Sequence, residues 1–390
     1  MSRALRNTAV GGIVAWGVLF VLLGQGMARA TPPQQLRVAG TPEQIGQAIG
    51  SHEAASLGAM HPQFLIIAQA IAGQDKATLY ARARKIEPFI DEPHRAEMRA
   101  IAGASGLTYD DVLFLNCFYT LTNRHTLACR QLAAWGKATT GGAGGADGEL
   151  LHARNLDWVD YPGQPLDKHH LILDITPSGK TSGTSGGRHV LLTWPGLMGA
   201  VTGTNDAGIT LGFNQLMEGD RKDRLAEPTF FTLRRVLEQA TTLQQAIDII
   251  EKARPLDNGS VLISSATEKQ AAVVEIIDGL VGVRRPPDGE SMIGNANHAT
   301  KEAGMDKLYR VRTWDCDWPT CSVARRLKTP IDVKQAQRIM SDPMVMQGRI
   351  NMLCVIFDPS HQKMYLSVRP TRAADGPFTE YELFGKSPSQ

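Results

Sequence analysis

The stretch Cys129–Trp158, which reads CRQLAAWGKATTGGAGGADGELLHARNLDW, decides the fold because it predicts a β-hairpin. Two half-apolar runs flank TTGGAGGADG, a tip rich in glycine, and glycine adopts the backbone angles of tight turns at little cost. If Thr139 faces Glu149, antiparallel pairing places Val159 opposite Cys129. The hairpin therefore brings the cysteine to the end of the second strand.

The same pairing predicts the charged neighbours of this cysteine. Asp157 would lie diagonally across from Cys129 on the same face, about 7 to 8 Å away between backbones. Arg154 would lie on the opposite face and reach the thiol only through a bulge or around the strand end. A cysteine with such partners predicts a nucleophile, and the alternative is a buried structural thiol.

The composition is that of a globular protein. The chain has 390 residues, of which 43% are hydrophobic and 21% charged, so it can bury a sizeable core. Lys and Arg together number 41 and Asp and Glu 39, and no basic run is interleaved with aromatic residues. Nucleic acid is therefore not an expected partner.

The first thirty residues have the pattern of a signal peptide. Two arginines precede an uncharged apolar run, residues 9–24, and Ala28-Arg29-Ala30 provides a small-residue cleavage site. We expect export to the periplasm or the medium, with cleavage after Ala30. The alternative is an uncleaved membrane anchor at residues 9–24. No later segment is expected to span a bilayer.

The cysteine count suggests one thiol outside any disulfide. An exported protein can oxidise pairs, and an odd count leaves one over. Spacing favours a Cys316–Cys321 pair without establishing it. The five cysteines are Cys117, Cys129, Cys316, Cys321 and Cys354.

The order of elements predicts an α+β layered sandwich. Residues 41–121 read as mostly helical, with capping residues at Thr41 and Thr108. Two further helices are expected at 229–239 and 242–252, and another from Asp332. Consecutive strands, then helices, then strands favour this sandwich over a doubly wound fold. The expected strands are LILDIT, HVLLTW, GITLGFNQL, SVLISSA, AAVVEII, GLVGVRR, NMLCVIF and KMYLSV.

Metal and nucleotide chemistry are not supported by motifs. His52-Glu53 lacks the second histidine of a zinc helix, no CxxC occurs, and no phosphate-binding glycine loop is followed by Lys-Ser or Lys-Thr. We therefore expect no metal and no cofactor. A secreted zinc hydrolase is the alternative that metal analysis would test.

Several segments, in order, resemble the acyl-coenzyme A:isopenicillin N acyltransferase family. This family consists of self-cleaving N-terminal nucleophile cysteine hydrolases and is related to bile salt hydrolases and penicillin V acylases. The matching segments are AGTPEQIGQAIG, RAEMRAIAGASGLTYDDVLFLNCFYTL, Cys129 with AAWGKAT, LLHARNLDW, GTNDAGITLGFNQL, AAVVEI, NANH and SVARRL.

The resemblance implies a four-layer αββα sandwich and a chain that cuts itself between Ala128 and Cys129. Residues 31–128 would form a helical N-terminal segment and residues 129–390 the catalytic domain, associated as an αβ heterodimer. The freed α-amino group of Cys129, with an ordinary pKa of about 7.7 to 8.0, would act as general base for its thiol.

The resemblance also implies the site residues. Asp157 matches an aspartate that orients the amine of the nucleophile, and Arg154 an arginine near the thiol that favours thiolate. Asn214 and Asn297 match asparagines that donate to the oxyanion, and Arg325 matches a late arginine. Asn295 is an alternative to Asn297, and Arg310 or Arg312 to Arg325. Structural roles are expected for Glu275, Trp135 and Trp158.

Two residues depart from the family pattern. Ala128 stands where related sequences commonly have Gly, and Arg130 where Thr or Ser is common. Small Ala still permits the strained bond that cleavage requires, whereas Arg130 places a charge beside the site and makes a carried-over substrate preference uncertain.

The resemblance thus implies an exported cysteine amidohydrolase or acyltransferase that cleaves a non-peptide acyl amide through a thioester on Cys129. Its partners would be a small acylated amide and an acyl-accepting amine. The alternatives are a bile-salt-hydrolase-like or penicillin-acylase-like hydrolase, or a non-cleaving exported binding protein of the same fold.

Overall fold

A computed structural model describes residues 32–122, 127–140, 148–158, 166–178, 187–219, 224–300, 319–346, 348–369 and 372–385. The expected signal peptide, residues 1–30, lies outside these ranges. So do Val159, Cys316, Arg310 and Arg312, and the Cys316–Cys321 disulfide therefore stays a prediction.

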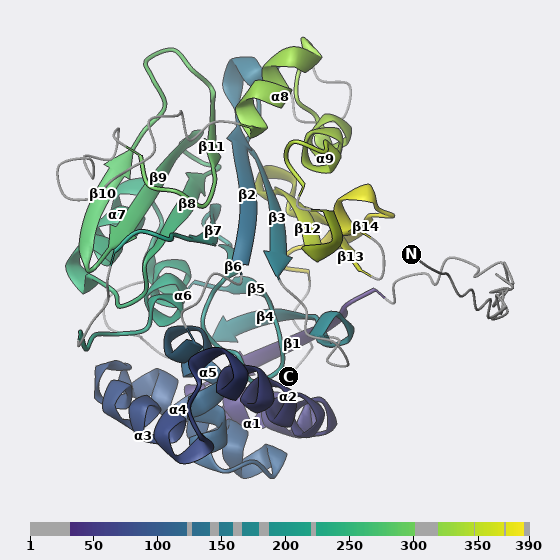
Figure 1. The fold of residues 1–390 in the computed structure, drawn as a ribbon. Helices are drawn as coiled ribbons and strands as arrows, with labels where there is room; N and C mark the ends of the chain where they lie inside the picture. The colour runs from purple at the N-terminus through teal and green to yellow at the C-terminus, as the bar shows by residue number, and fades with distance from the viewer. Residues whose placement is uncertain are drawn as a thin grey trace, which may run out of the picture.

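The N-terminal segment is helical as predicted, but a strand precedes its helices. Thr41 caps the first helix through a capping box with Gln44, and Thr108 and Asp111 exchange hydrogen bonds at the start of the last. Figure 1 shows these helices gathered at one end of the molecule, below the strands. The elements are β1 (Gln34–Gly40), α1 (Pro42–His52), α2 (Ala54–Ala72), α3 (Lys76–Ile86), η1 (Glu87–Phe89), α4 (Glu92–Ser105) and α5 (Tyr109–Thr122).

The strands form two sheets. The larger has the order β1-β4-β5-β6-β7-β8-β9-β10, and the smaller β11-β2-β3-β12-β13-β14. Only β1, beside β4, is paired in parallel among the described strands. The bounds are β2 (Leu127–Ala134), β3 (Leu151–Trp158), β4 (Leu171–Pro177), β5 (His189–Thr193), β6 (Thr202–Asn205), β7 (Ile209–Gln215), β8 (Gly259–Ser265), β9 (Gln270–Ile277), β10 (Leu280–Arg284), β11 (Met292–Asn295), β12 (Asn351–Asp358), β13 (Lys363–Val368) and β14 (Thr379–Glu382).

The sheets face each other between layers of helices. Strand β2 contacts β7 and β8, and β11 contacts β8 and β9, so the two sheets pack face to face. Helices α6 and α7 pack on the outer face of the larger sheet, and α8 and α9 on that of the smaller. The predicted αββα sandwich is confirmed. The remaining elements are η2 (Gly136–Ala138), η3 (Leu166–His169), α6 (Thr229–Gln239), α7 (Leu243–Ala253), α8 (Thr320–Leu327), α9 (Val333–Ser341), η5 (Gly348–Ile350), η6 (Pro359–His361) and η7 (Ala373–Asp375).

One helix corrects an expectation about membranes. By length and composition α2 could cross a bilayer, with a mean hydropathy of 1.2, so the expectation that no segment after residue 30 qualifies is wrong. Leu57, Met60 and Phe64 of α2 are fully buried, and the helix packs against α5. One face of α2 thus belongs to the core of the protein.

The hairpin forms where predicted, but its register is not the predicted one. Cys129 pairs with Leu156, and Ala128 pairs with Asp157. Thr139 does meet Glu149, whose carbonyl accepts from the Thr139 hydroxyl at 2.9 Å. Between this contact and the strands, the 3₁₀ turn η2 takes three residues of one strand out of the ladder. Because three is odd, every side chain of one strand changes face relative to the other.

Two sequence predictions about faces are therefore wrong. Arg154 lies on the same face of the sheet as Cys129, toward the larger sheet, and needs no bulge to reach it. Asp157 lies on the other face, toward α9, and not diagonally beside the Cys129 side chain. Both errors have one cause, the three residues that η2 removes from the strand pairing.

Candidate active site

Cys129 lies in β2, at the interface of the two sheets, and its side chain is fully buried. Burial raises the pKa of its thiol, because an apolar surrounding disfavours the thiolate, and the neighbouring Arg154 guanidinium acts in the opposite direction. Among the described residues, Cys117, Cys129 and Cys354 form no disulfide. In the uncut chain the thiol is therefore present, reduced and closed off from solvent.

Arg154 is the cation at the sulfur. Its Nη2 lies 3.6 Å from Cys129 Sγ and donates to the carbonyl of Phe213 at 2.6 Å, while Nη1 donates to the carbonyl of Val201 at 3.2 Å. The side chain is fully buried. Backbone carbonyls of the opposite sheet thus hold the guanidinium in place beside the thiol.

Asn297 is held at the backbone nitrogen of Cys129. Its Oδ1 accepts from Cys129 N at 2.6 Å and from Arg130 Nη1 at 3.1 Å, and its Nδ2 donates to the carbonyl of Gln215 at 2.8 Å. The resemblance implied a donor to the oxyanion. In the structure Asn297 is an acceptor, at the nitrogen that the resemblance expects to become an α-amino group.

Arg130, the departure from the family pattern, folds back onto the site. Its Nη1 also donates to the carbonyl of Cys129 at 2.7 Å. The same guanidinium nitrogen therefore joins Asn297 to the main chain of Cys129. The extra charge lies beside Cys129, as expected from its position.

Asn214 reaches the site from the other sheet. It lies fully buried in β7, where its Oδ1 accepts from Gln131 Nε2 at 2.6 Å and its Nδ2 donates to the carbonyl of Ala296 at 3.3 Å. Ala296 precedes Asn297, so the nitrogen of Asn214 lies toward the segment that holds Cys129.

Asp157 lies in β3, the strand that also carries Arg154, but its side chain is on the opposite face. Its Oδ1 accepts from Asn351 Nδ2 at 2.7 Å, and Asn351 Oδ1 accepts from the backbone nitrogen of Ala374 at 2.7 Å. The carboxylate side chain is fully buried. Main-chain pairing with Ala128 nevertheless puts Asp157 across from the expected scissile bond.

Arg325 is not brought to Cys129 by any described contact. It lies in α8 with a side chain that is 43% exposed, 3.9 Å from Glu290. Its role therefore stays a prediction.

The alternative asparagine is accounted for by another contact. Asn295 Oδ1 accepts from the Ser260 hydroxyl at 2.9 Å, and its Nδ2 donates to the Ser260 carbonyl at 3.4 Å. Asn297, rather than Asn295, is therefore the asparagine at Cys129.

Three residues have the structural roles expected of them. Glu275 accepts from the backbone nitrogen and the hydroxyl of Thr300 at 3.0 and 2.8 Å. Trp158 packs edge to face on Trp194, and Trp135 belongs to a small apolar cluster. These contacts make Glu275 an anchor for the segment that carries Asn297.

Sequence reasoning missed Gln131 and Asn351. Both are fully buried amides that bond a predicted site residue, Asn214 and Asp157 respectively. Gln131 lies two residues after Cys129 in the same strand, so the alternation of side chains alone would have placed it on the same face. Asn351 opens a strand far along the chain, and no local signal marks it.

No group of three or more His, Cys, Asp or Glu side chains that could hold a metal occurs within the described ranges. The contact between Arg154 and Cys129 offers a thiol with a cation at its sulfur. A cysteine so placed in a facing pair of sheets, between helical layers, agrees with the class that the family resemblance implies, the N-terminal nucleophile hydrolases and acyltransferases.

Part of the chain is similar to a known family. Residues 144–314 match the acyl-coenzyme A:6-aminopenicillanic acid acyl-transferase family, which confirms the predicted family relationship. The matched region includes Arg154, Asp157, Asn214 and Asn297 and begins after Cys129.

Individual relatives are distant. Protein dcd1A of Dictyostelium discoideum is 28% identical over 49% of this chain and 42% of its own length. The N-acylethanolamine-hydrolyzing acid amidase of Caenorhabditis elegans is 22% identical over 49% of this chain and 53% of its own length. The chain thus spans about half the length of these curated relatives. The solved structure of penicillin V acylase from Agrobacterium tumefaciens has a TM-score of 0.41 and 14% identity, covering 62% of this chain and 84% of the acylase.

Proposed function

We propose that this chain is an exported, self-processing cysteine amidohydrolase or acyltransferase whose nucleophile is Cys129. The contact between Arg154 Nη2 and Cys129 Sγ carries the proposal. A structural thiol gains nothing from a buried guanidinium, whereas a nucleophile gains because the cation favours the thiolate.

Self-cleavage would begin with attack of Cys129 Sγ on the carbonyl carbon of Ala128. The C–N bond of the Ala128–Cys129 peptide breaks as the C–S bond forms, and the thiol proton passes to the departing nitrogen. Water then hydrolyses the thioester, which leaves a carboxylate on Ala128 and restores the thiol. The new α-amino group stays within reach of Asn297 Oδ1, which already accepts from the same nitrogen.

The mature enzyme would use the same groups on an amide substrate. The α-amino group takes the thiol proton, the sulfur attacks the acyl carbon, and Asn214 donates to the oxyanion. One such donor is typically worth about 2.7 to 4 kcal/mol of barrier. The leaving amine carries the proton away, and water or another amine then accepts the acyl group from the thioester.

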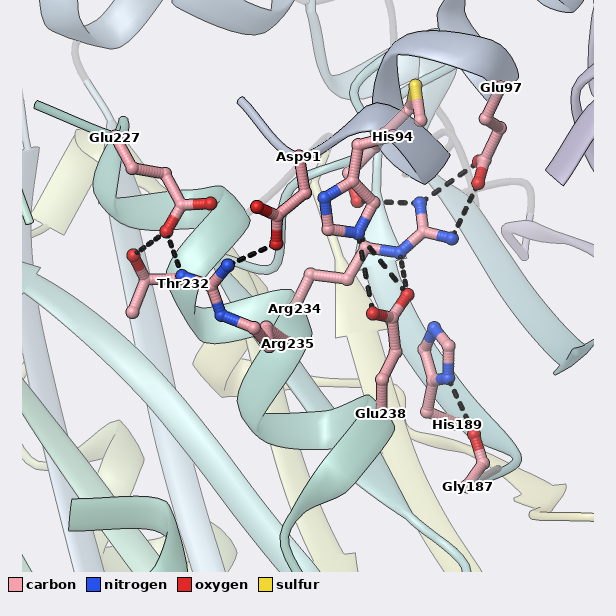
Figure 2. Close-up of polar contacts among 11 residues, drawn as sticks. Asp91, His94, Glu97, Gly187, His189, Glu227, Thr232, Arg234, Arg235 and Glu238 are labelled. Atoms are coloured by element: carbon pink, nitrogen blue, oxygen red, sulfur yellow. Dashed lines mark hydrogen bonds and ion pairs between the residues drawn. The ribbon is translucent and has the colours of Figure 1, made fainter. Parts of the chain in front are cut away.

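The N-terminal segment is proposed to stay bound after cleavage. Strand β1 pairs with β4 inside the larger sheet, and Glu97 of α4 forms two hydrogen bonds, of 3.0 and 2.7 Å, with Arg234 of α6. Figure 2 shows Arg234 between Glu97 and Glu238, with His94 beside Glu238. These contacts do not involve Cys129 and do not depend on the peptide bond that would be cut.

The test is the intact mass and N-terminal sequence of the purified protein beside Cys129→Ala. We expect two co-purifying fragments, one beginning at Cys129, and a single uncut chain in the variant. Cys354→Ala, which removes another fully buried cysteine, should cleave normally. A single uncut chain in the unmodified protein would refute self-processing and favour the binding-protein alternative.

Activity and export need separate measurements. The cleaved protein is expected to release amine from a series of N-acyl 4-nitroanilides, and Cys129→Ala should release none. Added hydroxylamine should divert the acyl group to a hydroxamate if transfer competes with hydrolysis. Fractionation of the native host should recover a chain that begins after Ala30; recovery with residues 1–30 intact in the membrane would support the anchor.

A further inference from the structure

A row of four fully buried polar side chains connects the two sheets beside Cys129. Ser264 of β8 lies 2.9 Å from His152 Nδ1, and His152 Nε2 lies 3.1 Å from Gln131 Oε1. Gln131 Nε2 in turn donates to Asn214 Oδ1. All four side chains have essentially no exposed surface. Such groups are costly to bury unless each is paired, and here each one is.

The direction of every hydrogen bond in this row follows from one backbone carbonyl. Gln131 Nε2 also donates to the carbonyl of Gly212 at 2.9 Å, and a carbonyl can only accept. The other end of the Gln131 amide is therefore its oxygen, which needs a donor. His152 must supply that donor from Nε2, so its Nδ1 is an acceptor and the Ser264 hydroxyl donates to it.

His152 has the protonation state that this assignment requires. Burial lowers the pKa of His152 to about 3, because the charged imidazolium is disfavoured away from water, and nearby Arg154 lowers it further. The ring is neutral at physiological pH, with one donor and one acceptor. The row therefore runs in one direction, from the Ser264 hydroxyl to Asn214 Oδ1.

Gly212 of β7 leaves the space through which the Gln131 and Arg154 side chains pass. A Cβ at this position would lie 2.2 Å from Gln131 Oε1 and 2.4 Å from Arg154 Nη1. Both side chains extend from the smaller sheet across the bare backbone of Gly212. Any other residue would displace the Gln131 amide and the guanidinium at the thiol together.

The consequence falls on Asn214. With Oδ1 turned to Gln131, Nδ2 turns to Ala296, next to the residue that holds Cys129 N. We propose that Gln131, His152 and Ser264 are positioning residues that fix the Asn214 amide with its nitrogen, not its oxygen, toward the carbonyl under attack. This inference rests on the proposed function, because it assigns Asn214 its donor role.

The first test removes the hydroxyl at the far end of the row. In Ser264→Ala the Nδ1 of His152 loses its donor, so the tautomer that presents an acceptor to Gln131 becomes available, and only the Gly212 carbonyl still holds the Gln131 and Asn214 amides in place. With the best-cleaved N-acyl 4-nitroanilide, we expect kcat to fall about tenfold with KM unchanged, as for a contact made only in the transition state. Ser264→Thr restores the hydroxyl and should restore kcat.

The matched control is Ser265→Ala. Ser265 follows in the same strand, is equally buried, and faces the other way, toward Thr267. It should leave kcat unchanged. A kcat lowered equally in both alanine variants, a change in KM alone, or no recovery in Ser264→Thr would each overturn the proposal.

The second test reverses the row near Asn214. Gln131→Glu keeps the shape but replaces the donor with a carboxylate, so the Asn214 amide should turn its nitrogen to residue 131. We expect kcat to fall about 10²- to 10³-fold, the usual effect of losing one oxyanion donor. If the unmodified chain cleaves itself and hydrolyses the substrate, and Gln131→Glu has the same kcat, only the positioning role is refuted. An unmodified chain that neither cleaves nor turns over refutes the proposed function as well. If Gln131→Glu does not fold, the comparison of Ser264→Ala with Ser264→Thr tests the positioning role.

Discussion

At the scale of single residues, Arg154 should set the pH at which Cys129 reacts. It is the main favourable influence on the thiolate, against burial, which raises the thiol pKa. In Arg154→Met we expect the pH–rate profile of self-cleavage in a cell-free translation to move up by about one pKa unit, which is tenfold in rate below the midpoint. Arg154→Lys, which keeps a charge without the planar fork, should shift it less. An unchanged profile in Arg154→Met would contradict the role.

Glu275 should make stability depend on pH near neutrality. Burial raises the pKa of Glu275 to about 7, although its bonds from Thr300 favour the charged form. A carboxyl group whose folded pKa is raised binds more protons in the folded state. Its contribution to stability is therefore complete below pH 4.5 and is lost as the pH rises toward 7 and beyond.

The corresponding variant is Glu275→Gln. It should remove this pH dependence and stabilise the protein at pH 8 by up to about 3 kcal/mol, the equivalent of the pKa difference. The side-chain amide of glutamine can still form hydrogen bonds with the backbone nitrogen and hydroxyl of Thr300. The measurement is the melting temperature at pH 5 and pH 8. If the melting temperature falls equally between pH 5 and pH 8 in both proteins, groups other than Glu275 cause the pH dependence.

At the scale of elements, local patterns predicted most of the fold. The helical pair buries Phe231, Val236, Leu243, Ile247 and Ile250, the residues expected from helical spacing. Strand β1 was missed because it pairs with β4, far along the chain, and only alternate short apolar residues mark it. The hairpin was located, but its register depended on η2, a turn that glycine-rich sequence does not specify. The sequence therefore predicted Arg154 and Asp157 on the wrong faces.

Gly212 should control how closely strand β7 packs against β2. Gly212→Ala should separate β7 from β2, because the new methyl group would overlap the Gln131 amide and the Arg154 guanidinium. We expect loss of self-cleavage and a lower melting temperature, since overpacking a core costs about 1 to 3 kcal/mol. Gly103→Ala in α4 meets nothing within 4 Å and should be neutral or stabilising. Normal cleavage in Gly212→Ala would contradict the tight crossing.

At the scale of the whole molecule, the proposed cut divides the chain but not its core. Helix α5 is buried along its length, and Asn116 within it donates to the carbonyl of Gly196 and accepts from Met198 N. Thr120 donates to Asp257 at 3.0 Å. Contacts of this kind join both products of cleavage, so a cleaved protein should unfold as one unit and not in two steps.

The buried pair of Glu97 and Arg234 should dominate the attachment of the N-terminal segment. Both side chains are 2% exposed, and removing one partner leaves the other charge buried, which typically costs about 3 to 5 kcal/mol. Glu97→Ala should therefore lower the urea midpoint sharply and release the N-terminal fragment of the cleaved protein during gel filtration in mild urea. Glu92→Ala, on the same helix, removes a carboxylate that is 61% exposed and pairs with Arg95, and should cost less than about 1 kcal/mol. Equal midpoints for the two variants would show that the apolar contacts of α5, rather than this ion pair, hold the fragments together.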